Sequence, residues 1–132
     1  MAMRSDRLQH VSVPRPPGDE AHRRAVSFYA GVLGLEEVPK PRTFTDIDVT
    51  WFRIEDCEIH VFASPPEDKA HPGAHFCLAV EDLAATRSAL QSASCKIHAA
   101  TPIPNRPRFY AHDPFGNQIE FTEIQGDYLA SP

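Results

Sequence analysis

The chain has few cysteines and no long apolar run. Its three cysteines, Cys57, Cys77 and Cys95, form no close pair, which is typical of core thiols in a reducing compartment and argues against a disulfide scaffold. No stretch approaches the length that spans a membrane. The first residues, Met1 to Arg7, are charged and lack the apolar segment of a signal peptide. The sequence therefore predicts a cytoplasmic protein that makes no use of a membrane.

A basic run is also missing. The formal net charge of −5 argues against a surface that binds nucleic acid. With 132 residues, of which 42% are hydrophobic and 23% charged, the chain can bury one ordinary core. Prolines, by contrast, are abundant: there are 13, gathered in short clusters between the apolar segments. We therefore expect a single globular domain whose elements are separated by proline-containing turns.

The first half of the chain predicts a strand, a helix and further strands. A strand over 8–13 precedes a segment, 20–33, in which apolar residues recur at helical spacing. Gly34 follows at the position where a helix favours a left-handed C-terminal cap. After an irregular segment that can hold a short edge strand, two strands are expected at 49–54 and 57–63, joined by a tight turn.

The second half repeats this order. A strand begins at His75, a helix follows the capping residue Asp82, and a weak strand is expected near 96–100. Two last strands flank a turn in which Pro114 and Gly116 suit the backbone angles. We therefore predict an α+β fold of two tandem βαβββ modules, which occupy 7–64 and 74–125 and are joined by a linker at 65–73.

Four of the predicted strands each place one metal-ligand type of residue opposite their bulky apolar residues. Side chains alternate between the two faces of a strand, so Ile119 and Phe121 share a face while Glu120 lies on the other. The residues in this position are His10, His60, His75 and Glu120. Three imidazoles and a carboxylate that point away from the apolar layer form a candidate metal centre.

The fourth ligand of this centre stays open at this point. Glu58 lies on the same face as His60, so Glu58 could ligate with His60 as a proton-transfer group. The internal repeat favours His60, which takes the place that Glu120 takes in the second module. Mixed imidazole and carboxylate ligands suit Zn, Ni, Co, Fe or Mn and disfavour Ca. A centre without His60 would leave room for the chemistry of Fe(II) dioxygenases.

The third strand of each module predicts the residues that bind substrate. Trp51 and Arg53 in the first module, and Arg108 and Tyr110 in the second, are expected to project into the cavity. Guanidinium groups beside aromatic rings favour an anionic substrate with a flat or apolar part, although rim salt bridges and a core aromatic are the structural alternative. His112 shares a face with Tyr110 and is a candidate for the cavity rim. The other histidines are expected to be solvated: His22, His71 and His98.

Several motifs resemble those of the vicinal oxygen chelate superfamily, the group of glyoxalase I, fosfomycin-resistance proteins, bleomycin-binding proteins and extradiol dioxygenases. The matching segments are Leu8–Val11, Ser27–Leu35, Val80–Leu83 and, as the most specific, Phe109–Phe121. The resemblance implies paired βαβββ modules that curl into an open mixed-sheet barrel around a divalent metal. In this family the ligands come from the first and last strands of each module, which correspond here to His10, His60, His75 and Glu120.

The resemblance also implies a function. It favours a metal-dependent lyase or isomerase of the glyoxalase type, which acts on a small substrate chelated through vicinal oxygens, with a metal-stabilised enediolate and Glu120 as the base. The alternatives are a small-molecule binding protein of the bleomycin-resistance kind and an Fe(II) extradiol-type dioxygenase. Two-module chains of this family commonly pair, and pairing would cover sheet edges. We therefore expect a homodimer whose ligands meet within one chain or across two.

Overall fold

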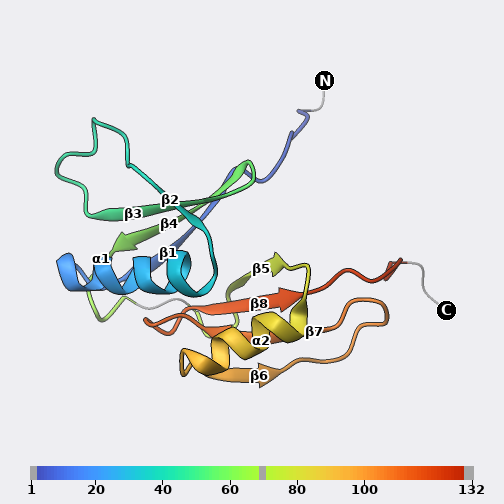
Figure 1. Ribbon diagram of the computed structural model, residues 1–132. Helices are drawn as coiled ribbons and strands as arrows, with labels where there is room; N and C mark the ends of the chain where they lie inside the picture. Colours follow the sequence, from blue (N-terminus) through green and yellow to red (C-terminus); the bar gives the residue numbers. More distant parts are fainter. Residues whose placement is uncertain (1–2, 69–70, 130–132) are drawn as a thin grey trace.

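The computed structural model describes residues 3–68 and 71–129, and its strands form two four-stranded mixed sheets (Figure 1). The first sheet has the order β1-β4-β3-β2 and the second β5-β8-β7-β6. The strands of the first sheet are β1 (His10–Arg15), β2 (Glu36–Val38), β3 (Val49–Ile54) and β4 (Cys57–Ala63). Those of the second are β5 (His75–Ala79), β6 (Ile97–Ala99), β7 (Arg108–His112) and β8 (Gln118–Thr122). The two sheets repeat one topology, which is the predicted α+β fold of two βαβββ modules with unclosed, curled sheets.

Within each sheet, one pair of strands is parallel and the others are antiparallel. β1 runs parallel to β4, and β5 runs parallel to β8. The pairs β2–β3, β3–β4, β6–β7 and β7–β8 are antiparallel. Among the described residues, no strand pairing joins the two sheets, so the modules meet through side chains and turns.

The first helical segment has two parts. α1 (Asp19–Val26) continues into η1 (Ser27–Val32), a π-helical stretch in which the Leu33 amide donates to the Phe28 carbonyl at 3.0 Å. The helix expected over 20–33 is thus confirmed in position but is more widely wound in its second half. In this stretch the neighbouring residues Phe28 and Tyr29 are both buried, at 3% and 0% exposure.

The second helix, α2 (Leu83–Ser92), begins at the predicted cap. The Asp82 carboxylate accepts from the Ala85 amide at 3.0 Å, which satisfies a backbone donor that the first helical turn leaves free. In the part of the chain that the structure describes, no helix is long and apolar enough to cross a membrane.

The apolar faces of both sheets pack into one core. Alternation along the strands buries Ile59 and Val61 in β4 and Ile119 and Phe121 in β8, each at 1% exposure or less. These are the residues whose parity predicted the apolar layer. The core also includes side chains from both helical segments: Tyr29, Phe28 and Leu90. Because one face of each sheet is used for this core, the opposite face of each sheet is left for polar residues.

A buried network of hydrogen bonds connects the two modules. The Tyr29 hydroxyl donates to Asp113 Oδ2 at 2.7 Å, and the Asn117 side-chain amide donates to the same oxygen at 2.8 Å. Asp113 Oδ1 accepts from the backbone amides of Phe115 and Asn117, each at 2.9 Å. Burial raises the pKa of Asp113, although these hydrogen bonds act in the opposite direction. Asn117 also donates to the Pro14 carbonyl at 2.8 Å, so the β7–β8 turn of one module is held against β1 of the other.

We expect Gly116→Ala to lower the free energy of unfolding by about 1 kcal/mol. Gly116 has φ +91, as the turn predicts, and a Cβ there would meet nothing within 4 Å, so the cost comes from the backbone alone. Gly31→Ala is the matched control, because it lies in η1 without a positive φ and has equal space. Urea unfolding of both variants measures the difference, and equal stabilities would contradict the strained-turn explanation.

Candidate metal centre

The structure places the four predicted metal ligands in two pairs, one on each sheet. His10 and His60 lie on the first sheet, with ring centroids 4.2 Å apart. His75 and Glu120 lie on the second, with Nε2 and Oε1 3.1 Å apart. Within the described residues, no three His, Cys, Asp or Glu side chains are grouped so that they could hold a metal ion. One chain therefore presents two half-sites, and the four-ligand centre stays a prediction.

On the second sheet, the orientation of His75 is fixed by the backbone. Its Nδ1 lies 3.1 Å from the Gly73 carbonyl oxygen. A carbonyl can only accept, so Nδ1 carries the proton in this contact and the neutral ring presents a lone pair at Nε2. Nε2 faces Glu120, which is 3% exposed; it donates to the carboxylate when it carries a proton and offers its lone pair to a metal when it does not. An imidazole whose other nitrogen donates to a backbone carbonyl is the usual arrangement of a metal-binding histidine.

Two arginines hold the carboxylate of Glu120. Arg106 Nη2 lies 2.5 Å from Oε2, and Arg108 Nη1 lies 3.4 Å from Oε1. Arg108 also donates to the Tyr110 hydroxyl at 2.9 Å. Arg106 therefore occupies one carboxylate oxygen and leaves the other facing His75. This half-site carries two guanidinium charges against one carboxylate, an arrangement that attracts an anion.

Arg106 is a site residue that sequence reasoning missed. It lies in the proline-rich loop before β7, and a residue in a loop has no strand parity to predict its direction. The available signal was its spacing of two residues from Arg108, which places both on one side if the extended chain continues back from the strand.

On the first sheet, His60 lies between two rings. Its ring stacks on Trp51 at a centroid distance of 3.9 Å and an interplanar angle of 10°, and on His10 at 4.2 Å and 21°. A metal bonds to an imidazole nitrogen near the ring plane, at about 2.1 Å. Because the planes of His10 and His60 are nearly parallel, they do not meet at that distance. One ring has to turn before both can bind the same ion.

Glu58 is the partner of His60. Its Oε1 lies 2.9 Å from His60 Nε2, so a proton on Nε2 is held by the carboxylate. The hydrogen bond to His60 lowers the pKa of Glu58, against the effect of burial. This contact leaves Nδ1 of His60 free, and it gives Glu58 the role of orienting the ring in the arrangement that the structure shows.

The predicted substrate-binding residues also divide between the sheets. Arg53 pairs with Glu36 at 2.5 Å on an exposed edge, with half of its side chain accessible, which matches the salt-bridge alternative. Trp51 lies on His60, and its Nε1 is buried without a hydrogen-bond partner among the described residues. Tyr110 meets the His75 ring edge-on at 5.0 Å. Tyr110 and Arg108 therefore border the second half-site, whereas Arg53 does not.

The environment of Cys77 differs from the one that the sequence predicts. Its thiol is exposed, because β5 lies at the edge of its sheet and Cys77 stands opposite Glu120 in the strand register. Arg106 Nη2 lies 3.8 Å from its Sγ. The prediction of a core thiol is wrong for this residue. The polar face of the second sheet thus carries a thiol beside the carboxylate and its arginines.

Comparison with known families agrees with this topology. Residues 7–121 match the model of the Glyoxalase/Bleomycin resistance protein/Dioxygenase superfamily. The chain belongs to this superfamily. The match covers both modules and contains all four predicted ligands, so the predicted family is confirmed. The superfamily includes several activities, and membership alone does not distinguish among them.

Several solved structures share the fold of this chain. A structure described as a glyoxalase family protein from Bacillus anthracis has a TM-score of 0.84 and 30% identity, covering 94% of this chain and 99% of its own. A lactoylglutathione lyase from Agrobacterium tumefaciens has a TM-score of 0.64, 19% identity and coverages of 92% and 96%. TnmS3, an antibiotic binding protein from Streptomyces sp. CB03234, has a TM-score of 0.70, 19% identity and coverages of 93% and 99%. A search of curated proteins gave no match.

Proposed function

We propose that this protein is a metal-dependent lyase or isomerase of the glyoxalase type, acting on a small molecule with adjacent oxygens. The observation that carries the proposal is the pair His75 and Glu120. With Nδ1–H donating to the Gly73 carbonyl, Nε2 and the Glu120 oxygen 3.1 Å away are both acceptors unless the ring carries a second proton. Two acceptors facing each other require a cation, either a proton on the ring or a metal beside both. Imidazole and carboxylate together suit Zn, Ni, Co, Fe or Mn.

We further propose that two copies of the chain complete each centre. Each copy would supply His75 and Glu120 from its second sheet and His10 and His60 from its first, to two different centres. The separation of the donors into two pairs on unjoined sheets supports this arrangement. A two-fold dimer would then contain two equivalent centres, since an isologous interface uses each contact twice.

The residues of the chain have separate parts in the proposed chemistry. A divalent metal, when bound, would polarise adjacent substrate oxygens and acidify a neighbouring C–H group. Once substrate had displaced Oε1 of Glu120 from the metal, Glu120 would accept that proton at Oε1, while Arg106 holds Oε2 in place. Arg108 and Tyr110 would bind an anionic part of the substrate. Trp51, stacked on His60, would supply an apolar wall.

A second candidate function is small-molecule binding without catalysis. The observation that favours it is the pair of guanidinium groups on Glu120, which lets the second half-site hold an anion without any metal. An antibiotic binding protein is among the structures that share this fold. Metal analysis of protein purified without chelator separates the two functions: stoichiometric metal supports the enzyme, and failure to bind or rebind any transition metal supports the binding protein.

Mixing two variants tests the shared centre. We expect His10→Ala/His60→Ala and His75→Ala/Glu120→Gln each to bind no divalent metal alone. After joint unfolding and refolding, their heterodimers should regain one of two centres, because one centre receives every intact ligand. Metal content of the isolated, differently tagged heterodimer would be roughly half that of the unmodified dimer. A heterodimer without metal would place the centre within one chain, and a monomer in sedimentation would contradict the dimer.

A further inference from the structure

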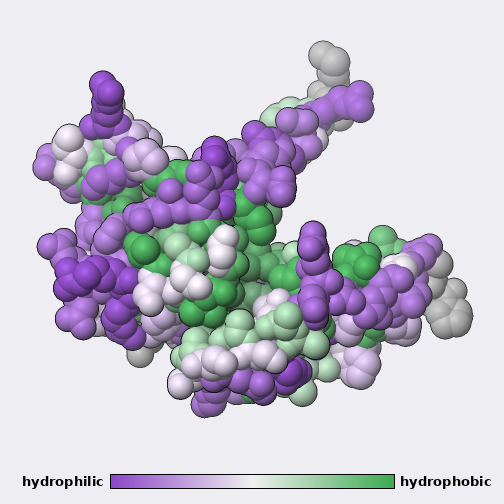
Figure 2. Space-filling model, in the orientation of Figure 1, coloured by the Kyte–Doolittle hydropathy of each residue, from purple (hydrophilic) through white to green (hydrophobic). Residues whose placement is uncertain are grey.

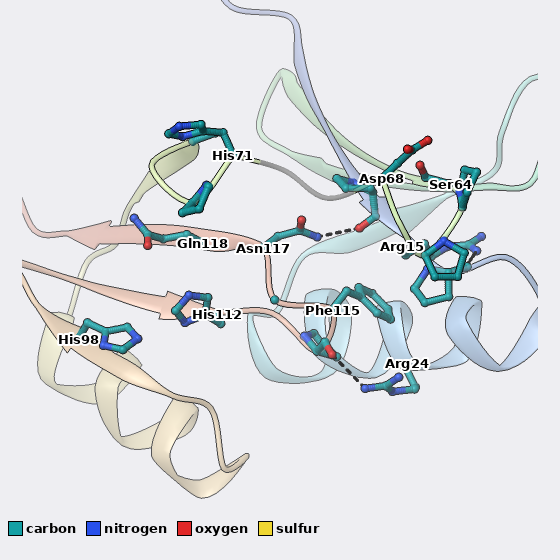
Figure 3. A pocket seen from close by; sticks show the side chains of 18 residues that line it. Arg15, Arg24, Ser64, Asp68, His71, His98, His112, Phe115, Asn117 and Gln118 are labelled. Atoms are coloured by element: carbon teal, nitrogen blue, oxygen red, sulfur yellow. Dashed lines mark hydrogen bonds between the residues drawn. The ribbon is translucent and has the colours of Figure 1, made fainter.

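A cavity lies at the junction of the modules, apart from the His75–Glu120 pair. It encloses about 760 Å³. The end of β1, the segment after β4 and the β7–β8 turn form its walls, and Figure 3 shows His98, His112 and Gln118 on one side with Arg15 and Arg24 on the other. Neither His75 nor Glu120 lines it. The volume is that of a pocket for a drug-sized molecule.

The walls of this cavity combine apolar surface with positive charge. Phe115 and several prolines provide the apolar part. On the outer face drawn in Figure 2, hydrophobic residues gather around the η1 end of the first helix, with polar residues around them. The charge comes from Arg15 and Arg24, beside three imidazoles. Asp68 is the one carboxylate among the described lining residues. Arg15 is already paired with Asp48, which leaves Arg24 as the unpaired arginine of the wall.

Arg24 is the cation that a ligand could use. Its Nη2 donates to the Pro114 carbonyl at 3.0 Å, and its guanidinium lies 5.3 Å from the centre of the Phe115 ring. Among the described residues, no carboxylate pairs with it within 4.0 Å. A carbonyl and a ring satisfy hydrogen bonding without cancelling the charge. Arg24 can therefore pair with an anion that stands against Phe115.

Two buried polar atoms of lining residues have no partner. Arg15 is 2% exposed, and although Asp48 and Thr50 occupy its Nη2, its Nε has no partner among the described residues. Nδ1 of His112 is also buried and unpartnered. Unsatisfied buried polar atoms are uncommon in folded proteins and indicate a missing water, ion or ligand. Both atoms belong to the walls of the same cavity.

Two of the imidazoles that line the cavity lie against each other. His98 and His112 meet edge to face, with centroids 5.0 Å apart. Burial lowers the pKa of His112, and the nearby His98 and Lys96 lower it further, against a smaller opposite effect of Asp113. An anion bound beside His112 would act in the opposite direction and raise its pKa.

We propose that this cavity binds a small organic anion, with a carboxylate directed at Arg24 and a flat apolar body between Phe115 and the prolines. The site is separate from the proposed metal centre and does not depend on it. Its ligand class is an aromatic or otherwise flat carboxylic acid.

Binding of 2-naphthoate and its neutral counterpart 2-naphthamide to metal-free protein tests the proposal. We expect naphthoate to bind at least about tenfold more tightly than the amide, as a charge-assisted contact requires. The backbone amide signals of Gly116 and Asn117 should shift in a protein-observed NMR titration. Equal affinities for acid and amide, or shifts confined to the strands of His75 and Glu120, would overturn it.

Two neighbouring arginine variants test whether the preference for the acid depends on Arg24. Arg24→Gln should remove the preference for the acid, whereas Arg23→Gln, an exposed arginine one position away on α1, should leave it intact. His75→Ala should leave naphthoate binding unchanged, so this proposal and the metal centre fail separately. An identical loss for Arg23→Gln and Arg24→Gln would reduce the effect to general charge and contradict the site.

Discussion

Glu120→Gln is expected to lower the affinity for Ni²⁺ or Zn²⁺ at least about 100-fold, more than the loss typical of a residue that only orients a ligand. Glutamine keeps the shape of the side chain but loses the charge that a divalent ion requires. It also leaves Arg106 and Arg108 without their carboxylate, which adds repulsion toward a cation. Isothermal titration of metal into protein stripped by chelator measures the loss.

Two control variants separate ligation from general charge. Glu58→Gln removes the carboxylate beside His60, and we expect a loss of roughly 10-fold, as for an orienting partner. Arg106→Gln leaves Glu120 in place and is expected to keep or raise the affinity. If Glu58→Gln costs as much as Glu120→Gln, Glu58 is the fourth ligand and His60 is not. Unaltered metal binding by Glu120→Gln would contradict the proposed centre.

Asp113→Ala is expected to lower the free energy of unfolding by about 3–5 kcal/mol, the cost of removing one partner from a buried charged network. Asp113 accepts four hydrogen bonds and is 5% exposed. Its loss leaves the Tyr29 hydroxyl and two backbone amides unsatisfied. Because this network joins the modules, the loss affects the whole fold and not one turn. Urea unfolding followed by circular dichroism measures the change.

Tyr29→Phe distinguishes the hydroxyl from the rest of the network. It removes one donor to Asp113 and should cost about 1.5–3 kcal/mol, the range for a hydrogen bond to a charged group. The double variant should cost less than the sum, because the two residues share that bond. Additive costs would show that Tyr29 and Asp113 act independently and would contradict the network.

The sequence was sufficient for the fold because its signals are local. Alternation separates Ile119 from Glu120 whatever the rest of the chain does: Ile119 lies in the apolar core, whereas Glu120 contacts His75 and Arg106. Gly34 and Gly116, predicted from helix-cap and turn chemistry, both have positive φ. The repeated order of elements then leaves few topologies for two βαβββ modules.

The arrangement of the candidate site could not be predicted in the same way. Alternation tells on which face of a strand a side chain lies, but not how the two sheets are placed relative to each other. The separation of the His10–His60 pair from the His75–Glu120 pair could therefore not be predicted. The contact between Arg106 and Glu120 depends on the path of a proline-rich loop. Alternation places Cys77 on the face of His75, but the exposure of its thiol also depends on β5 being an edge strand, a property of sheet order.

Pro14 gives the open edge of the first sheet a further property. The carbonyls of Gln9 and Arg15 accept from Glu58 and Ser64 on the β4 side, so odd-numbered residues of β1 bond inward and Pro14 faces outward. Its nitrogen has no hydrogen to donate, and its carbonyl is already taken by Asn117. A further strand therefore cannot add at this end of β1, which protects this edge of the first sheet against edge-to-edge pairing with another copy.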